Sequence, residues 1–112
     1  MKRIAIPIFK SRISPVFDTC TRLLVVDFDQ GNEVHRQEIY LNKLSLHERQ
    51  RILGSLNVHV FICGGITETF QKMINTPDNR FITGKTGGVE EVLAAFFAGK
   101  IDNKKFQMPG MK

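Results

Sequence analysis

Short runs of strand-forming residues alternate with turn-forming segments along the chain, and they predict a sheet. The runs cover residues 4–9, 23–28, 33–41, 58–63 and 80–82. The first run, residues 4–9, is nearly continuously apolar, as expected of a central strand that is buried on both faces. Pro7 has no N–H for a ladder bond, so the first strand should end within a residue or two of it. Residues 29–32 (DQGN) separate the second and third runs and predict an antiparallel hairpin.

Helical spacing appears three times after the hairpin. The predicted helices cover residues 45–57, 67–76 and 89–99. Ser45 with Glu48 three residues later is a capping-box signature for the start of the first helix. Pro77 should stop the second helix. The third has apolar residues at i, i+3, i+4, i+7 and i+8 from Val89, and Gly99 is placed to end it.

This order of elements, β-β-β-α-β-α-β-α, predicts an α/β fold with a five-stranded mixed sheet and flanking helices. An antiparallel hairpin comes first, and helix crossovers then bring the later strands in parallel. Residues 1–112 form one predicted domain, with an irregular tail from about 101 to 112. Three loops, residues 10–21, 63–68 and 83–88, should meet beyond the carboxyl ends of the parallel strands, where open α/β sheets bind ligands.

Composition narrows the class of protein. With 112 residues and 42% hydrophobic residues, the chain can bury one core, and it contains no apolar run near the roughly 20 residues of a membrane span. The N-terminus lacks a signal-peptide pattern, so we expect a cytoplasmic protein without membrane contact. The net charge of +5 comes from scattered Lys and Arg, and leaves open a solvated basic surface or an anion-binding role. Two cysteines are too few for a disulfide framework, which leaves both thiols free for metal.

The cysteines occupy two of the predicted ligand-edge loops. The first loop, SRISPVFDTCTR, holds Cys20. There Ser14-Pro15 should stiffen the loop and Phe17 should anchor it to the core, with Asp18 facing a ligand. Cys63 ends a strand and precedes Gly64-Gly65, where the backbone can approach a ligand or another element closely. Both thiols have two open interpretations, a small buried apolar residue or a thiolate ligand.

Other polar residues give weaker signals. The segment TGKTGG at residues 83–88 lacks the P-loop order, but its N–H groups and Lys85 could bind an anion; a simple turn and helix cap is the open alternative. His59 should share a face with Phe61 and Cys63, and a satisfied, partly buried histidine is the favoured interpretation. There is no CxxC or HExxH for a conventional zinc site, and no catalytic constellation, so we do not expect an enzyme.

Four stretches in register resemble a known family. They are KRIAIPIF, RISPVFDTCTRLLVVDFD, VFICGGI and TGGVEEVLAAFFAGKI. Together they resemble the dinitrogenase iron-molybdenum cofactor biosynthesis domain, of the NifX/NifB type, over nearly the whole chain. The resemblance implies a ribonuclease-H-like three-layer fold without catalytic activity of its own. It also implies a domain that holds iron-molybdenum cofactor precursors or related metal-sulfur clusters, which are anionic.

The chain departs from this family at two positions. Asp18 stands where many relatives have a glycine. Met111 follows Met-Pro-Gly, where a subgroup has a cysteine, although a thioether is still a soft ligand.

The prediction is therefore a small non-catalytic carrier of a metal-sulfur cluster, with cofactor-assembly or acceptor proteins as partners. Cys20 and Cys63 are the candidate ligands, and His59 and Met111 are secondary candidates. The residues expected to form the pocket are Ser14, Asp18, Gly64, Gly65, Lys85, Gly87 and Gly88. Two alternatives stay open: a cluster-free interaction or regulatory module on the same fold, and, less favoured, a nucleic-acid-binding domain, which the pI of about 9.5 suggests.

Overall fold

The computed structural model describes residues 1–109 and contains the predicted strands and helices. The strands are β1 (Lys2–Phe9), β2 (Arg12–Ile13), β3 (Arg22–Asp29), β4 (Asn32–Tyr40), β5 (Val60–Ile62) and β6 (Arg80–Ile82). The helices are α1 (Leu46–Leu56), α2 (Glu68–Ile74), α3 (Val89–Phe97) and the short 3-10 helix η1 (Lys104–Phe106). Within the described residues, no helix has the length and apolar character that a membrane span requires.

The sheet is mixed, as predicted, but it has six strands rather than five. Its order is β4-β3-β1-β5-β6, with β3 antiparallel to both neighbours and β1, β5 and β6 parallel. The additional strand, β2, pairs with the end of β1 through Ile8 and Ile13. Lys10, at φ 56°, turns the chain back directly after β1. Two residues are too few to produce an alternating pattern, which is why the sequence did not indicate this strand.

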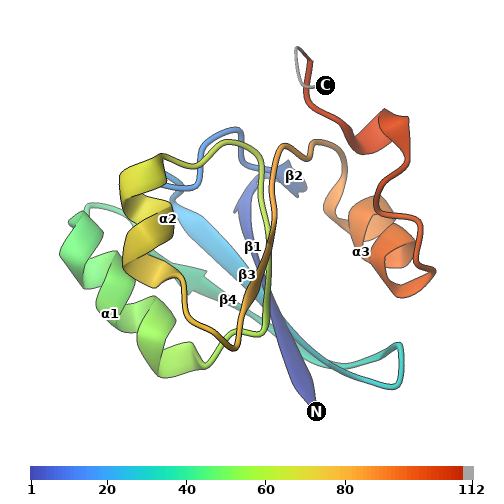
Figure 1. Ribbon diagram of the computed structural model, residues 1–112, viewed down its shortest axis with the longest axis horizontal. Helices are drawn as coiled ribbons and strands as arrows, with labels where there is room; N and C mark the ends of the chain where they lie inside the picture. The colour runs from blue at the N-terminus through green and yellow to red at the C-terminus, as the bar shows by residue number, and fades with distance from the viewer. Residues whose placement is uncertain (110–112) are drawn as a thin grey trace.

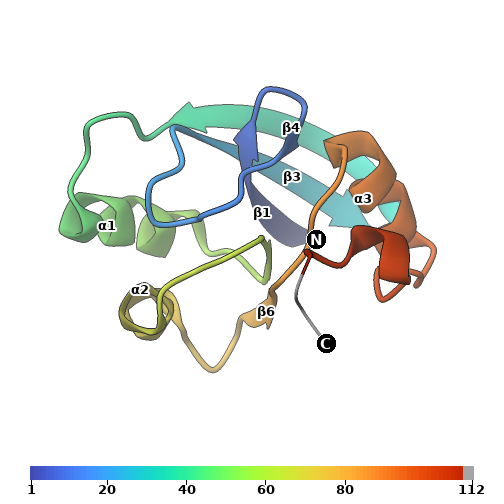
Figure 2. The same ribbon diagram turned by 90° about the horizontal axis from the view of Figure 1, so that it is seen from above.

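Helices cover both faces of the sheet and produce three layers (Figures 1 and 2). Alternation along β1 directs Ile4, Ile6 and Ile8 to the side of α3, and Ala5 to the side of α1 and α2. Each side has its own cluster of buried apolar residues. The sheet therefore separates two cores. A candidate site residue can contact only residues on the same face of the sheet.

Local signals set the turns and the helix starts. In the β3–β4 hairpin, Gln30 and Gly31 both have positive φ, which matches the tight turn that a right-twisted pair of strands favours. At α1 the capping box is present in both directions, with Glu48 N–H donating to Ser45 Oγ at 3.2 Å and Ser45 N–H donating to Glu48 Oε1 at 3.1 Å. These elements follow from residues close in sequence.

The described part of the C-terminal tail, residues 101–109, contains the short 3-10 helix η1 and packs against the core. Ile101 and Phe106 are buried in the core on the α3 side. Thr86 N–H donates to the Phe106 carbonyl at 2.7 Å, and Met108 N–H donates to the Gly84 carbonyl at 2.9 Å. Burial of two apolar side chains and these backbone bonds hold the tail against the end of the sheet. Met111, a secondary candidate ligand, lies outside the described residues.

Candidate functional site

The three loops predicted to meet beyond the parallel strands are joined by backbone hydrogen bonds. The first and second loops pair where Gly65 N–H donates to the Pro15 carbonyl at 2.7 Å and Phe17 N–H donates to the Gly65 carbonyl at 2.8 Å. The second and third pair where Lys85 N–H donates to the Cys63 carbonyl at 3.0 Å. The prediction that these loops share one edge of the sheet is thus confirmed.

The glycines in these loops permit the close approach of the chains. A Cβ on Gly64 would lie 2.9 Å from the Pro15 carbonyl oxygen, 3.0 Å from that of Ser14 and 3.2 Å from Met108 Sδ. A side chain there would push the loops apart. Gly87 has φ +130°, which L side chains rarely adopt, and Gly88 caps α3 without a side-chain hydrogen bond. The close packing of the loops therefore explains why residue 64 is a glycine, and no bound ligand is needed to explain it.

The loop that carries Cys20 is anchored by its phenylalanine, as predicted. Phe17 is fully buried, with its ring centroid 5.8 Å from Phe61 and 5.5 Å from Phe70. Ser14 is buried too, and its hydroxyl donates to the Val16 carbonyl at 3.2 Å. These contacts fix the loop on the side of the sheet that α1 and α2 cover.

Asp18 has a structural partner on the second loop. Its buried carboxylate accepts hydrogen bonds from the Thr67 N–H, at 3.0 Å, and from the Thr67 hydroxyl. Thr67 is the N-cap of α2 and in turn accepts from Phe70 N–H at 3.1 Å. Asp18 therefore ties the Cys20 loop to the start of α2 through charge-assisted bonds.

The two thiols lie in the same buried cluster between the sheet and the helices α1 and α2. Cys20 is 3% exposed and Cys63 is fully buried. Burial raises the pKa of Cys20 to about 11, an effect that the nearby Arg49 partly opposes. Burial, with the charges of Asp18 and Cys20, raises the pKa of Cys63 to about 12. Both residues are therefore neutral thiols at physiological pH.

A buried arginine, which was not among the predicted site residues, stands next to Cys20. Arg49 is 6% exposed and donates from Nη1 to the Cys20 carbonyl at 2.5 Å and from Nε to the Leu44 carbonyl at 3.0 Å. Its Nη1 also lies 3.9 Å from Cys20 Sγ. The available signal was its position in α1, because Arg49 shares the apolar stripe with Leu46 and Leu53.

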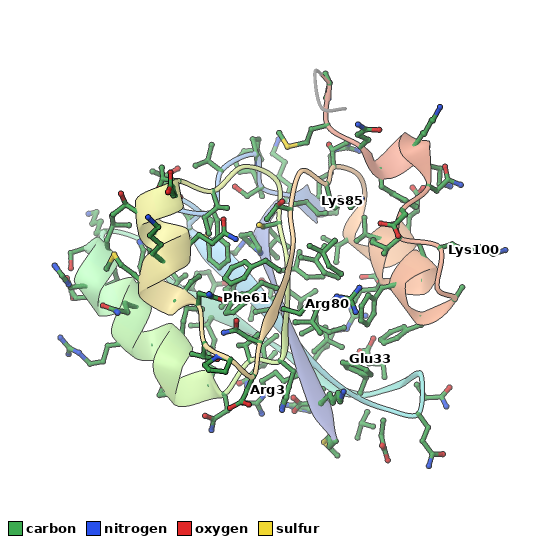
Figure 3. All side chains as sticks on the ribbon, in the orientation of Figure 1. Arg3, Glu33, Phe61, Arg80, Lys85 and Lys100 are labelled. Atoms are coloured by element: carbon green, nitrogen blue, oxygen red, sulfur yellow. The ribbon has the colours of Figure 1, made fainter. Side chains whose placement is uncertain are left out.

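Lys85 and His59 do not join the thiols. Lys85 forms an ion pair with Asp102 at 3.7 Å and lies beside the C-terminal segment, whereas Phe61 points to the side of α2 (Figure 3). His59 lies before β5, at the opposite end of that strand from Cys63, and its Nδ1 accepts from the Arg3 N–H at 3.0 Å. The interpretation of His59 as a satisfied, partly buried histidine is confirmed.

No group of three or more His, Cys, Asp or Glu side chains in residues 1–109 is arranged to hold a metal ion. Cys20 and Cys63 are two candidate ligands, fewer than the four cysteines that iron-sulfur clusters commonly use. A cluster at this edge would need donors beyond these thiols.

Comparisons with solved structures agree on the fold. The crystal structure of the protein PH0822 superposes with a TM-score of 0.81, at 17% identity over 96% of this chain and 95% of that one. The crystal structure of a "putative dinitrogenase" from Methanocaldococcus jannaschii gives 0.74, at 20% identity over 88% and 89%. An NMR structure described in the same words, from Methanococcus jannaschii, gives 0.72, at 19% identity over 99% and 95%.

A search among curated proteins gave no significant match. The family model described as "Dinitrogenase iron-molybdenum cofactor" matches residues 1–99, which include all six strands and the helices α1 to α3. The resemblance inferred from the four sequence stretches is therefore confirmed, and the chain belongs to the dinitrogenase iron-molybdenum cofactor family.

Proposed function

We propose that this protein is a small non-catalytic carrier that binds an anionic metal-sulfur cluster, an iron-molybdenum cofactor precursor or a related species, at the edge where the three loops meet. Cys20 and Cys63 would be its thiolate ligands. Proteins that donate and accept the cluster during cofactor assembly would be its partners. Membership in the iron-molybdenum cofactor family supports this role.

Arg49 is the observation that carries the proposal. Its guanidinium is buried beside Cys20 Sγ, and no carboxylate of residues 1–109 forms an ion pair with it. Hydrogen bonds to the Leu44 and Cys20 carbonyls compensate this buried cation, but no negative charge within the described residues pairs with it. A thiolate at Cys20, or an anionic cluster bound to it, would supply an opposite charge next to the guanidinium.

Cluster binding would require two changes at this site. Each thiol must lose its proton, which the raised pKa values oppose at neutral pH and which bonding to a metal would offset. The loops must also separate enough to admit the cluster, because both sulfurs are buried. Pocket-forming roles for Ser14, Asp18, Gly64 and Gly65 follow from their place in the same two loops. Lys85, Gly87 and Gly88 belong to the third loop and would contact only the outer part of a cluster.

The test is anaerobic reconstitution with iron and sulfide, with and without molybdate, followed by elemental analysis and a visible spectrum. We expect stoichiometric metal in the wild type, loss of metal in Cys20→Ser and Cys63→Ser, and weaker retention in Arg49→Met. Arg51→Met, on an exposed position of the same helix, is the matched control and should retain metal like the wild type. Urea unfolding of each variant separates loss of binding from loss of fold. A wild-type protein that takes up no metal would refute the carrier.

The burial of both thiols favours one other function. A cluster-free interaction or regulatory module would keep the fold and use Cys20 and Cys63 only as small core residues. That function predicts a wild type that stays colourless after reconstitution, with Cys20→Ala and Cys63→Ala variants that bind the same protein partners as the wild type.

A further inference from the structure

Strand β4 forms one edge of the sheet and is open along its outer side. It ends the strand order, at the edge of the sheet in Figure 2. Every one of its residues except Ile39 is exposed. A groove of about 520 Å³ lies along its α3 side, lined by Lys10, Arg36, Glu38 and Tyr40 among others. No strand of residues 1–109 pairs with this edge, so its outward N–H and C=O groups are available for another chain.

The backbone direction along β4 follows from its junction with β3. Leu41 N–H donates to the Thr21 carbonyl at 2.9 Å, so residue 41 directs its backbone groups toward β3. Because these directions alternate, residues 37 and 39 also face β3, and residues 36, 38 and 40 face outward. The ladder with β3 is regular from His35 to Tyr40, and a register shift precedes it.

One antiparallel register makes this edge complementary to itself. Opposing the outward residues of two copies around Gln37 places Arg36 opposite Glu38, and this pair occurs twice by symmetry. Tyr40, at the end of the regular ladder, is a large hydrophobic residue that is 71% exposed. Shifting the centre to Arg36 or to Glu38 would instead oppose two arginines or two glutamates.

We propose that β4 pairs with β4 of a second copy of this chain, antiparallel and with Gln37 on the twofold axis, to form one continuous sheet. In this register, the Arg36–Glu38 pair between the two copies adds to ion pairs that both residues already form within their own chain. Arg36 binds Glu33 at 2.6 Å and Glu90 at 2.8 Å, and Glu38 binds Arg22 at 2.8 Å. This proposal is independent of the cluster-carrier function.

Gln37 provides the sharpest test, because in this register it meets only itself and it forms no ion pair in its own chain. Gln37→Lys and Gln37→Glu each oppose two like charges, so each should raise the dimer dissociation constant about threefold to fivefold. Mixing the two variants should restore the dimer, because lysine then meets glutamate. Sedimentation over a range of concentrations measures the constants, and native mass spectrometry with one variant labelled with ¹⁵N identifies the mixed dimer.

Cysteine cross-linking tests the register directly. Two copies of Gln37→Cys would face each other in a non-hydrogen-bonded pair, at a Cα separation of about 4.5 Å that permits a disulfide. In the matched variant His35→Cys, the two cysteines would lie about 13 Å apart along the strands and should not cross-link. A wild type that stays monomeric at its highest soluble concentration would overturn the proposal. Equal cross-linking of both variants, or no restoration on mixing, would overturn the register.

Discussion

Replacing Gly64 with alanine tests whether the three loops are held together by close backbone contact. The Gly64 backbone does not have a positive φ, so alanine brings no backbone strain there and the effect is steric alone. The added Cβ would lie 2.9 Å from the Pro15 carbonyl oxygen and 3.0 Å from that of Ser14. Both are main-chain atoms that cannot rotate away, and real Cβ contacts are almost never under 3.0 Å.

The loss of stability can be judged from the contacts that the added Cβ would disturb. Separating the loops weakens the bonds that Gly65 makes with Pro15, at 2.7 Å, and with Phe17, at 2.8 Å. Overpacking of this kind costs about 1–3 kcal/mol, and we expect about 2 kcal/mol of lost unfolding free energy. Gly54→Ala is the matched control, because Gly54 lies inside α1 with nothing within 4 Å of its added Cβ. It should stabilise the protein by about 0.5–1 kcal/mol through helix propensity.

Urea unfolding followed by circular dichroism gives both free energies at equal protein concentration. The expected result is a lower midpoint for Gly64→Ala and a higher midpoint for Gly54→Ala, each with an unchanged slope. If Gly64→Ala is as stable as the wild type, the loops do not approach as closely as described, and Gly64 must be explained by something other than packing.

Two further predictions concern the core on each side of the sheet. The pKa values of Cys20 and Cys63 are raised to about 11 and about 12, above their ordinary 9.0. The free energy of unfolding should therefore be unaffected by these thiols below about pH 9 and should fall as the pH rises toward 11. The fall should reach up to about 1.4 kcal/mol per pH unit for each thiol. Urea midpoints under reducing conditions at several pH values measure this fall, and a Cys63→Ala variant with an equally steep fall would contradict its cause. In the tail, Phe106 is 3% exposed, so Phe106→Ala should cost about 3 kcal/mol while Lys105→Ala, at an exposed neighbour, should cost almost nothing. Equal thermal stability of these two variants would show that the tail does not belong to the core.

Several elements could be predicted because their signals are local. The capping box at Ser45, the DQGN turn and the spacing from Val89 each depend on residues within a few positions of one another. The meeting of the three loops also followed from the sequence, since strand order and crossover rules place the ends of parallel strands at one edge. Phe17 was predicted as an anchor because a large apolar residue in a loop needs a core to pack against.

Other features depended on residues far apart in the chain. The partner of Asp18 is Thr67, and the neighbour of Cys20 is Arg49; no local pattern pairs either residue with its partner. Lys85 lies near the thiols along the sheet edge but on the other side of the sheet, because the residues beyond β6 pack against the tail. The spacing of apolar residues predicts which face of one helix or strand is buried. Which charged side chains lie next to each other depends on how the helices and strands pack together.

The sequence by itself thus determined every strand except β2, the three α-helices and the edge at which the loops converge, because backbone preferences and apolar spacing act over a few residues. Only the tertiary structure decided that Cys20 and Cys63 are buried neutral thiols, that Arg49 stands beside Cys20 and that β4 has an open side. Burial and charge pairing are sums over contacts between distant segments, and no short stretch of sequence contains them.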